Sequence, residues 1–231
     1  IKIGKYQFPL SGGKIELLRR GVPFWEVLEK AGVRTTIIRI PANFPPSGSA
    51  HRELSGMGTP DLVGSYGIFH FFTTAPEPWD GREVSGGRVV PVAKIKNVVE
   101  GTLQGPDNPF LVEKTKLTID FKAFVDPVEP AAVLAVGDEE IVLKEGEWSG
   151  WVPVEFKLTW FQSLHGITRF HLKQVRPSFE LYVSPINLDP AAPAMPLSTP
   201  RSYAAELAMA TGPFHTQGIA GAERDRCRGD A

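Results

Sequence analysis

The chain has 231 residues, of which 42% are hydrophobic and 22% charged, and its formal net charge is −1. This balance is typical of a globular chain, and the length allows one large domain or two small ones. The near-zero charge argues against nucleic acid or an acidic membrane as the main partner. No apolar run approaches the ~20 residues of a transmembrane helix. The single cysteine, Cys227, excludes an internal disulfide and a thiolate metal cluster.

The stretch Gly21–Asp61 predicts a helix, a buried strand and a long loop, in that order. Pro23 suits the first helical position, and Gly32 the left-handed cap. The apolar strand Thr35–Ile40 follows, and Pro41 ends it. The apolar face of the predicted helix consists of Phe24, Val27, Leu28 and Ala31.

The loop Ala42–Asp61 is the predicted place for a ligand, because ligands of α/β sheets bind beyond the carboxyl ends of the strands. We expect this loop and residues 214–218 to border a cleft. The candidate substrate contacts are its polar residues Asn43, Arg52, Ser55 and Asp61. The alternative for each of them is an ordinary role in capping or turning the loop.

From residue 88 to residue 185 short apolar runs alternate with Gly, Pro, Asp or Asn, as in antiparallel β-structure. Val136–Glu139 has the composition of a hairpin turn. With Tyr66–Thr73, the predicted strands are Arg88–Lys96, Val98–Leu103, Thr115–Val125, Ala131–Val136, Glu139–Lys144, Val152–Trp160, Ile167–Val175 and Phe179–Ser184.

A proline-rich segment, Ser184–Pro200, precedes a second predicted helix, Arg201–Ala210, for which Thr199 is the expected N-cap. The predicted order along the chain is therefore a helix–strand segment, a long run of antiparallel strands and a second helix. We therefore predict an α/β fold with a large antiparallel insertion. Its parts are a core segment at 1–80, the insertion at 81–185, a proline-rich loop and return helix at 186–220, and a disordered tail at 221–231.

Several residues could in principle carry chemistry. His165 and His171 lie six residues apart on one predicted strand, hence on one face but ~20 Å apart, too far to share a metal ion. Gly56–Asp61 only faintly resembles a dinucleotide fingerprint. Four glutamates around the predicted hairpin could supply paired carboxylates for glycoside chemistry, or could simply lie on a solvated strand edge. They are Glu139, Glu140, Glu145 and Glu147.

Extended strings of this sequence resemble bacterial members of the alkaline phosphatase superfamily, in particular the type I phosphodiesterase/nucleotide pyrophosphatase family. The strings span about Gly4–Gly218; they are RRGVPFWEVLEKAGVRTTIIRIPANFPPSG, RELSGMGTPDLVGSYGIFHFFTT, GEWSGWV, HGITRFHLK, ELYVSPINLDP and SYAAELAMATGPFHTQG. The resemblance implies a partial alkaline-phosphatase-like α/β core with a β-rich insertion. It also implies hydrolysis of phosphodiester or pyrophosphate substrates by a Thr or Ser nucleophile at two divalent metals, usually zinc.

The sequence departs from the family at the metal-binding motif. It has no Asp-His pair, and Leu164 precedes His165-Gly166. No residue can therefore be matched to the nucleophile or to a metal ligand. We expect the chain to be an internal fragment of such a hydrolase, to bind no zinc and to be inactive alone.

Two alternatives remain. The chain could be a non-catalytic β-rich module that presents Trp148, Trp151 and Trp160 to a glycan, although aromatic residues at this spacing also fill sheet cores. It could also derive from a sulfatase or phosphomutase relative, which would differ in chemistry carried by other segments.

Overall fold

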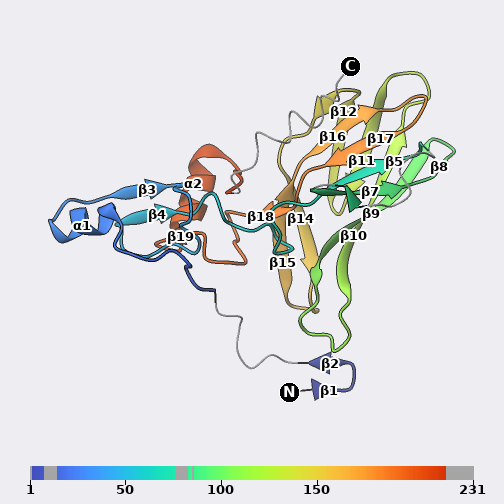
Figure 1. Ribbon diagram of the computed structural model, residues 1–231. Coiled ribbons are helices and arrows are strands. Elements are labelled where there is room, and N and C mark those ends of the chain that lie inside the picture. The colour runs from blue at the N-terminus through green and yellow to red at the C-terminus, as the bar shows by residue number, and fades with distance from the viewer. Residues whose placement is uncertain (1, 8–14, 76–82, 85, 217–231) are drawn as a thin grey trace.

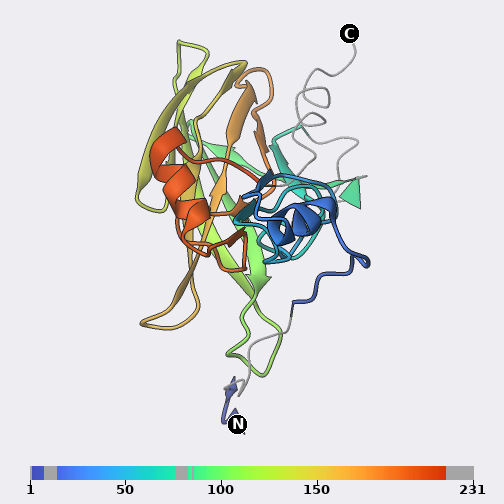
Figure 2. The same cartoon turned by 90° about the vertical axis from the view of Figure 1, so that its left-hand side faces the viewer.

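A computed structural model describes residues 2–7, 15–75, 83–84 and 86–216. Figure 1 shows a β-rich half and a smaller lobe that holds both helices of the described residues, and Figure 2 shows the same arrangement from the side. The smaller lobe consists of residues 15–65 and 197–212, and the β-rich half of residues 69–188. The predicted disordered tail at 221–231 lies outside the described residues.

Two large sheets form the β-rich half. The five-stranded sheet has the order β12-β11-β10-β9-β8, and its strands are β8 Lys94–Ile95, β9 Val98–Asp107, β10 Lys116–Val125, β11 Ala131–Val136 and β12 Glu139–Lys144. The six-stranded sheet has the order β13-β16-β17-β5-β7-β6, with β5 Phe69–Thr73, β6 Glu83–Val84, β7 Gly87–Pro91, β13 Glu147–Trp148, β16 Phe170–Gln174 and β17 Glu180–Val183. Nearly all their pairings are antiparallel; β5 and β7 are parallel.

Smaller sheets complete the fold. A three-stranded antiparallel sheet is made of β14 Val152–Lys157, β15 Ser163–Thr168 and β18 Asn187–Leu188. A two-stranded hairpin, β1 Lys2–Ile3 and β2 Tyr6–Gln7, docks on the loop between β9 and β10. In the smaller lobe, β3 Thr36–Ile38, β4 Arg52–Leu54 and β19 Ser198–Thr199 form another three-stranded sheet.

The sheets of the β-rich half enclose one large apolar core. Strand β10 shows why, because its residues alternate strictly between exposed and buried over its whole length. Phe121 of β10 meets Phe72 of β5 edge to face, with ring centroids 4.7 Å apart. Glycines in β9 leave room for core rings. A Cβ added to Gly101 would lie 2.4 Å from Phe121, and one added to Gly105 2.6 Å from Phe156.

The smaller lobe is built from α1 Phe24–Lys30, the β19-β4-β3 sheet and α2 Tyr203–Thr211. Among the described residues, its separate apolar cluster consists of Trp25, Ile37 and Ala50, with Ile40 packed against it. Helix α2 begins at Tyr203 after the N-cap Ser202, three residues beyond the predicted cap Thr199, which lies in β19.

The predicted α/β fold, a partial alkaline-phosphatase-like core with a β insertion, is wrong. The described residues contain two short helices against many strands in mainly antiparallel sheets. The β3–β4 parallel pair spans only three residue pairs, and the antiparallel strand β19 from the proline-rich segment closes its other side. The helix face expected to pack on a sheet is exposed: Phe24 by 61% and Val27 by 57%, while Trp25 is buried instead.

Individual elements are closer to expectation than the fold class. The strands Ala131–Val136 and Glu139–Lys144 and the turn between them are confirmed. Strand β4 was missed, because three residues inside a polar loop give little periodicity. The strand predicted at Ile167–Val175 is instead broken at Arg169, which separates β15 from β16 in a different sheet. Strand β5, from the predicted core segment, pairs with β17 and β7.

As to the membrane, no helix within the described ranges has the length and apolar character needed to cross a bilayer.

Candidate functional site

Three of the four predicted substrate contacts, Asn43, Ser55 and Asp61, are fully buried. Ser55 donates its hydroxyl to the Asn43 carbonyl oxygen at 2.7 Å, which ties the segment after β3 to the end of β4. The Asn43 side chain donates to the carboxylate of Glu53 at 2.9 Å. Asn43 and Ser55 therefore hold the predicted loop in shape, as in the alternative of loop capping.

Glu53 is the centre of this loop, although the sequence did not single it out. Its fully buried carboxylate accepts hydrogen bonds from the backbone N–H groups of Ser47, Ser49 and Ala50, each at 2.8 Å. Burial by itself would raise the pKa of Glu53, but the hydrogen bonds from Asn43, Ala50 and Ser47 outweigh it and lower the pKa below 4.5. The carboxylate thus organises the loop around a buried negative charge.

Asp61, later in the same loop, has the same kind of role as Glu53. It is fully buried, and its carboxylate accepts hydrogen bonds from the Ser65 N–H at 2.7 Å and from the Ser65 hydroxyl at 2.5 Å. The neighbouring Leu62 N–H donates to the Ile186 carbonyl at 2.7 Å, which joins this loop to the β-rich half.

Arg52 is the predicted contact that faces solvent. Its guanidinium lies 5.0 Å from the ring centroid of Tyr203 and 4.0 Å from a carboxylate oxygen of Glu206, both on α2. It therefore links β4 to the helix that covers it. The four predicted residues do not converge on one point of a cleft.

A different set of side chains converges where the smaller lobe meets the β-rich half. Arg39 follows β3, Arg169 lies at the break between β15 and β16, and His215 follows α2. The Trp151 ring lies 5.5 Å from the His215 ring and 5.8 Å from the Arg169 guanidinium. We call Arg39, Trp151, Arg169 and His215 the arginine–histidine cluster. Residues 214–218 were expected to border a cleft; of these, 217 and 218 lie outside the described residues, and His215 belongs to the cluster.

The backbone places Arg39 by an uncommon conformation. Its φ is +56°, in the left-handed region that non-glycine residues seldom adopt. Its N–H donates to the Leu54 carbonyl at 2.9 Å, which holds it beside the end of β4. Gly56 makes this approach possible, because a Cβ there would lie 2.5 Å from the Arg39 Cα. The strained residue thus lies at the carboxyl ends of two parallel strands, where binding residues are often found.

Arg169 is held by aromatic rings and a backbone carbonyl. Its guanidinium lies 5.2 Å from the Trp148 ring centroid, and its Nε donates to the Ser149 carbonyl at 3.0 Å. Trp148 in turn stacks on His171, with ring centroids 4.8 Å apart. These contacts orient a half-buried cation toward Trp151 and His215.

Positive charge and burial both act on His215. Burial lowers the pKa of His215, and the positive charges of Arg39 and Arg169 lower it further. The His215 Nε2 is buried and has no hydrogen-bond partner. A bound anion would counter the charge repulsion and would give this nitrogen an acceptor once the ring is protonated.

The sequence reasoning missed both arginines. The signal for Arg39 was present, because it follows the buried strand whose end was expected to carry a site. Arg169 gave none, because it stood inside a run read as one continuous strand, and only the break of that strand exposes its role.

The tryptophans of the glycan-binding alternative do not form one platform. Trp148 and Trp151 precede β14 in the chain, and their rings lie close to the Arg169 guanidinium. Trp160 follows the other end of this six-residue strand. At ~3.3 Å per residue the strand alone separates them by about 20 Å.

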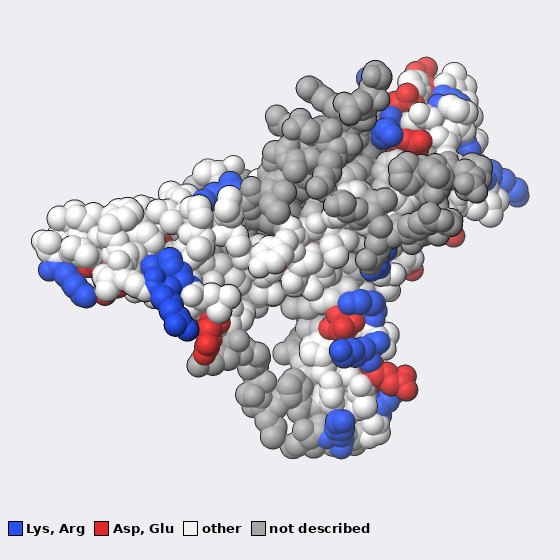
Figure 3. All heavy atoms as spheres, in the orientation of Figure 1, with Lys and Arg blue, Asp and Glu red and all other residues white. Residues whose placement is uncertain are grey.

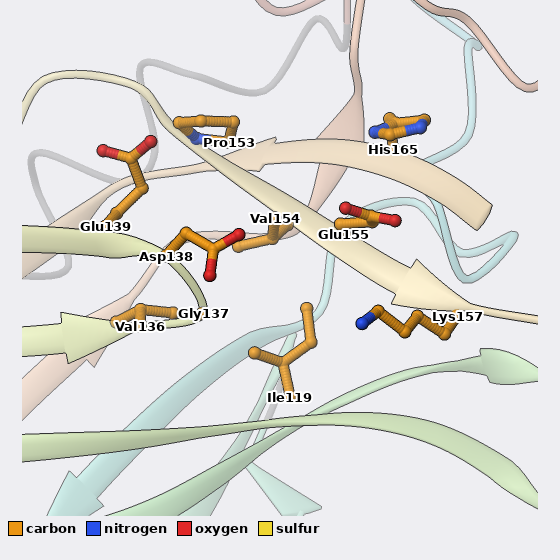
Figure 4. A pocket seen from close by; sticks show the side chains of 10 residues that line it. All are labelled: Ile119, Val136, Gly137, Asp138, Glu139, Pro153, Val154, Glu155, Lys157 and His165. Atoms are coloured by element: carbon orange, nitrogen blue, oxygen red, sulfur yellow. The ribbon is translucent and has the colours of Figure 1, made fainter.

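His165 lies on β15 and lines a hollow of about 300 Å³ between β14 and the β11–β12 turn. Figure 4 shows it near Glu155 and Lys157, with Asp138 and Glu139 on the other side. His171 lies in another sheet, with 8% of its surface exposed.

The resemblance implies two metals, but the described residues do not fit that role. Across the part of the chain that the structure describes, no three or more His, Cys, Asp or Glu side chains are grouped to hold a metal ion. We therefore assign no metal ligands in this chain.

Comparison with known proteins adds no relative: no family model, no curated protein and no solved structure matches this chain.

Proposed function

We propose that this chain forms the part of a phosphodiesterase- or nucleotide-pyrophosphatase-type hydrolase that binds the anionic phosphoester group. The observation that carries the proposal is the arginine–histidine cluster. The Trp151 ring lies beside the His215 ring and the Arg169 guanidinium, and the positive charges of Arg39 and Arg169 both act on His215.

The chemistry of these side chains suits a phosphoester or pyrophosphate. The planar guanidinium of arginine matches two phosphate oxygens at once, and the partial burial of Arg169 strengthens the attraction. His215 would take up a proton as the anion binds, because a nearby negative charge raises the pKa of an imidazole. The Trp151 ring offers a flat surface for an aromatic or sugar group attached to the phosphate.

The string resemblance to the type I phosphodiesterase family supports the same substrate class. The residues assigned here bind and orient the anion. We assign neither a nucleophile nor a metal ligand to this chain, so the bond-breaking step would depend on residues other than these.

Titration calorimetry with inorganic pyrophosphate at low salt tests the proposal. We expect the chain to bind it, and Arg169→Ala to weaken binding by about 10-fold to 100-fold, as for the loss of a charge-assisted hydrogen bond. Arg39→Asn and His215→Gln should also weaken binding. Asparagine is chosen at position 39 because it tolerates a positive φ.

Arg34→Ala is the matched control, because Arg34 is an exposed arginine of the same lobe outside the cluster. It should leave the affinity within about twofold of the unaltered chain. Absence of pyrophosphate binding, or equal losses for Arg34→Ala and Arg169→Ala, would overturn the proposal.

A further inference from the structure

Two aromatic side chains are exposed at the tip of the β14–β15 hairpin. The relative exposure of Trp160 is 104%, and that of Phe161 is 84%. The N–H groups of Leu158 and Thr159 donate to the Gln162 carbonyl at 2.9 and 3.1 Å, so the two aromatics lie at the centre of a tight turn. Gly, Asn, Asp and Ser are usual at such positions. With these exposures, the two rings add nothing to the core.

This tip does not stand alone at its end of the molecule. The Asn108 side chain donates to the Leu158 carbonyl at 3.0 Å, which joins the β9–β10 loop to the β14–β15 hairpin. The N-terminal hairpin docks on the same loop, since the Gln7 N–H donates to the Phe110 carbonyl at 2.8 Å. Figure 1 shows β1, β2 and both hairpin tips at one end of the β-rich half.

Lysines outnumber acidic residues in the three segments at this end, and Lys157 and Glu155 line a hollow together with Trp160. Within residues 2–7, 107–116 and 157–163, all of them described, the acidic residues are Asp107 and Glu113, and the lysines are Lys2, Lys5, Lys114, Lys116 and Lys157. Lys116 pairs with Asp107 at 3.0 Å. Figure 3 shows lysines and arginines at this end, with acidic groups interspersed among them. We call these three segments the lysine–aromatic end.

We propose that the lysine–aromatic end binds the surface of an anionic lipid bilayer. A protruding turn can insert Trp160 and Phe161 at headgroup depth, where aromatic side chains are favoured. The lysines then face the negatively charged lipids, each contributing about 1 kcal/mol. An exposed aromatic turn at an end with an excess of lysines suits an anionic bilayer, into which its rings can insert.

The charge of this end differs from that of the whole chain. The net charge of −1 argued against an acidic membrane as partner, but it averages over the whole chain. Association with a surface depends on the charge of the face presented to it, and the lysine–aromatic end is positive.

Co-sedimentation of the full chain with vesicles tests the proposal, using phosphatidylcholine alone or with about a third phosphatidylserine. We expect binding only to the mixed vesicles, weakening as salt shortens the Debye length. The double variant Trp160→Ala/Phe161→Ala should lower the partition coefficient about tenfold or more. Each of Lys5→Ala and Lys114→Ala should lower it about fivefold.

The matched control is Val128→Ala/Lys96→Ala. Both residues are exposed, and they lie in turns at the other end of β9 and β10. This variant should bind the mixed vesicles like the unaltered chain. Circular dichroism should show that every variant is folded.

Three outcomes would overturn the proposal: no binding to mixed vesicles, equal losses in the control and tip variants, or self-association of the chain that only the tip variant abolishes. The last outcome would identify the tip as a protein contact.

Discussion

The two halves of this molecule are stabilised in different ways. The β-rich half buries a large apolar core between sheets whose strands alternate regularly, as β10 does. The smaller lobe has an apolar cluster of three buried residues and is organised around the buried carboxylate of Glu53. Burial of apolar surface is non-directional, whereas hydrogen bonds to a buried charge fix the positions of particular backbone groups.

This difference bears on where function can lie. A loop held by a buried charge keeps a defined shape without a large core beneath it, so the smaller lobe can present Arg39 in a strained conformation. The β-rich half supplies Trp151, just before β14, and Arg169, between β15 and β16. The arginine–histidine cluster thus combines Arg39 from the smaller lobe with Trp151 and Arg169 from the β-rich half.

The largest expected effect of a single substitution is in the β-rich half. Phe121→Ala would remove a ring that is 99% buried and packs against Phe72 at the meeting point of two sheets. We expect the free energy of unfolding to fall by about 4 kcal/mol, measured by urea denaturation. Phe124→Ala, on the exposed face of the same strand, should cost less than about 1 kcal/mol. Similar losses for both variants would show that this core is not the main source of stability.

The second effect is a pH dependence of the stability of the β-rich half. Burial lowers the pKa of His70 on β5 to about 4, and the charge of Arg88 adds to this. The unfolded chain takes up this proton near pH 6.5, so stability should be lost as the pH falls from about 6.5 to about 4 and should change no further below that. The total loss from this group is about 3 kcal/mol. His70→Phe should flatten the pH dependence of the urea midpoint over this range, and an unchanged slope would contradict the assignment.

The strands of the β-rich half were largely predictable, because a strand buried on one face repeats with period two. The hairpin at Ala131–Lys144 is the clearest case. The fold class was not predictable in the same way. A helix followed by an apolar strand fits an α/β unit, but sequence alone cannot show that β19, more than a hundred residues later, closes the other side of β4.

The candidate site was harder still to predict. Asn43, Ser55 and Asp61 are polar residues in a loop beyond a strand, which is the pattern of ligand contacts and equally that of loop anchors. The difference lies in their partners: Glu53 and Ser65 occupy their polar groups. The arginine–histidine cluster joins residues 130 and 176 positions apart, and no local pattern reports such proximity.

The smallest of the three stability effects concerns the charge that organises the smaller lobe. Glu53→Gln keeps the size of the side chain but replaces one acceptor oxygen by a donor, which would face the N–H groups of Ser47, Ser49 or Ala50. We expect a loss of about 2 kcal/mol, within the range for hydrogen bonds to a charged group. Hydrogen exchange of these three amides should become faster, while amides of the five-stranded sheet keep their protection.

The same charge predicts a pH dependence for the smaller lobe. Because the pKa of Glu53 is lowered on folding, its contribution is present above pH 4.5 and is lost as the pH falls through the folded value. Exchange of the Ser47, Ser49 and Ala50 amides, corrected for intrinsic rates, should therefore accelerate at acid pH in the unaltered chain. In Glu53→Gln that change should be absent, and Glu140→Gln, on the exposed surface of β12, should behave like the unaltered chain. Equal protection of the three amides in Glu53→Gln and the unaltered chain would mean that the loop is held by its apolar contacts, as the β-rich half is.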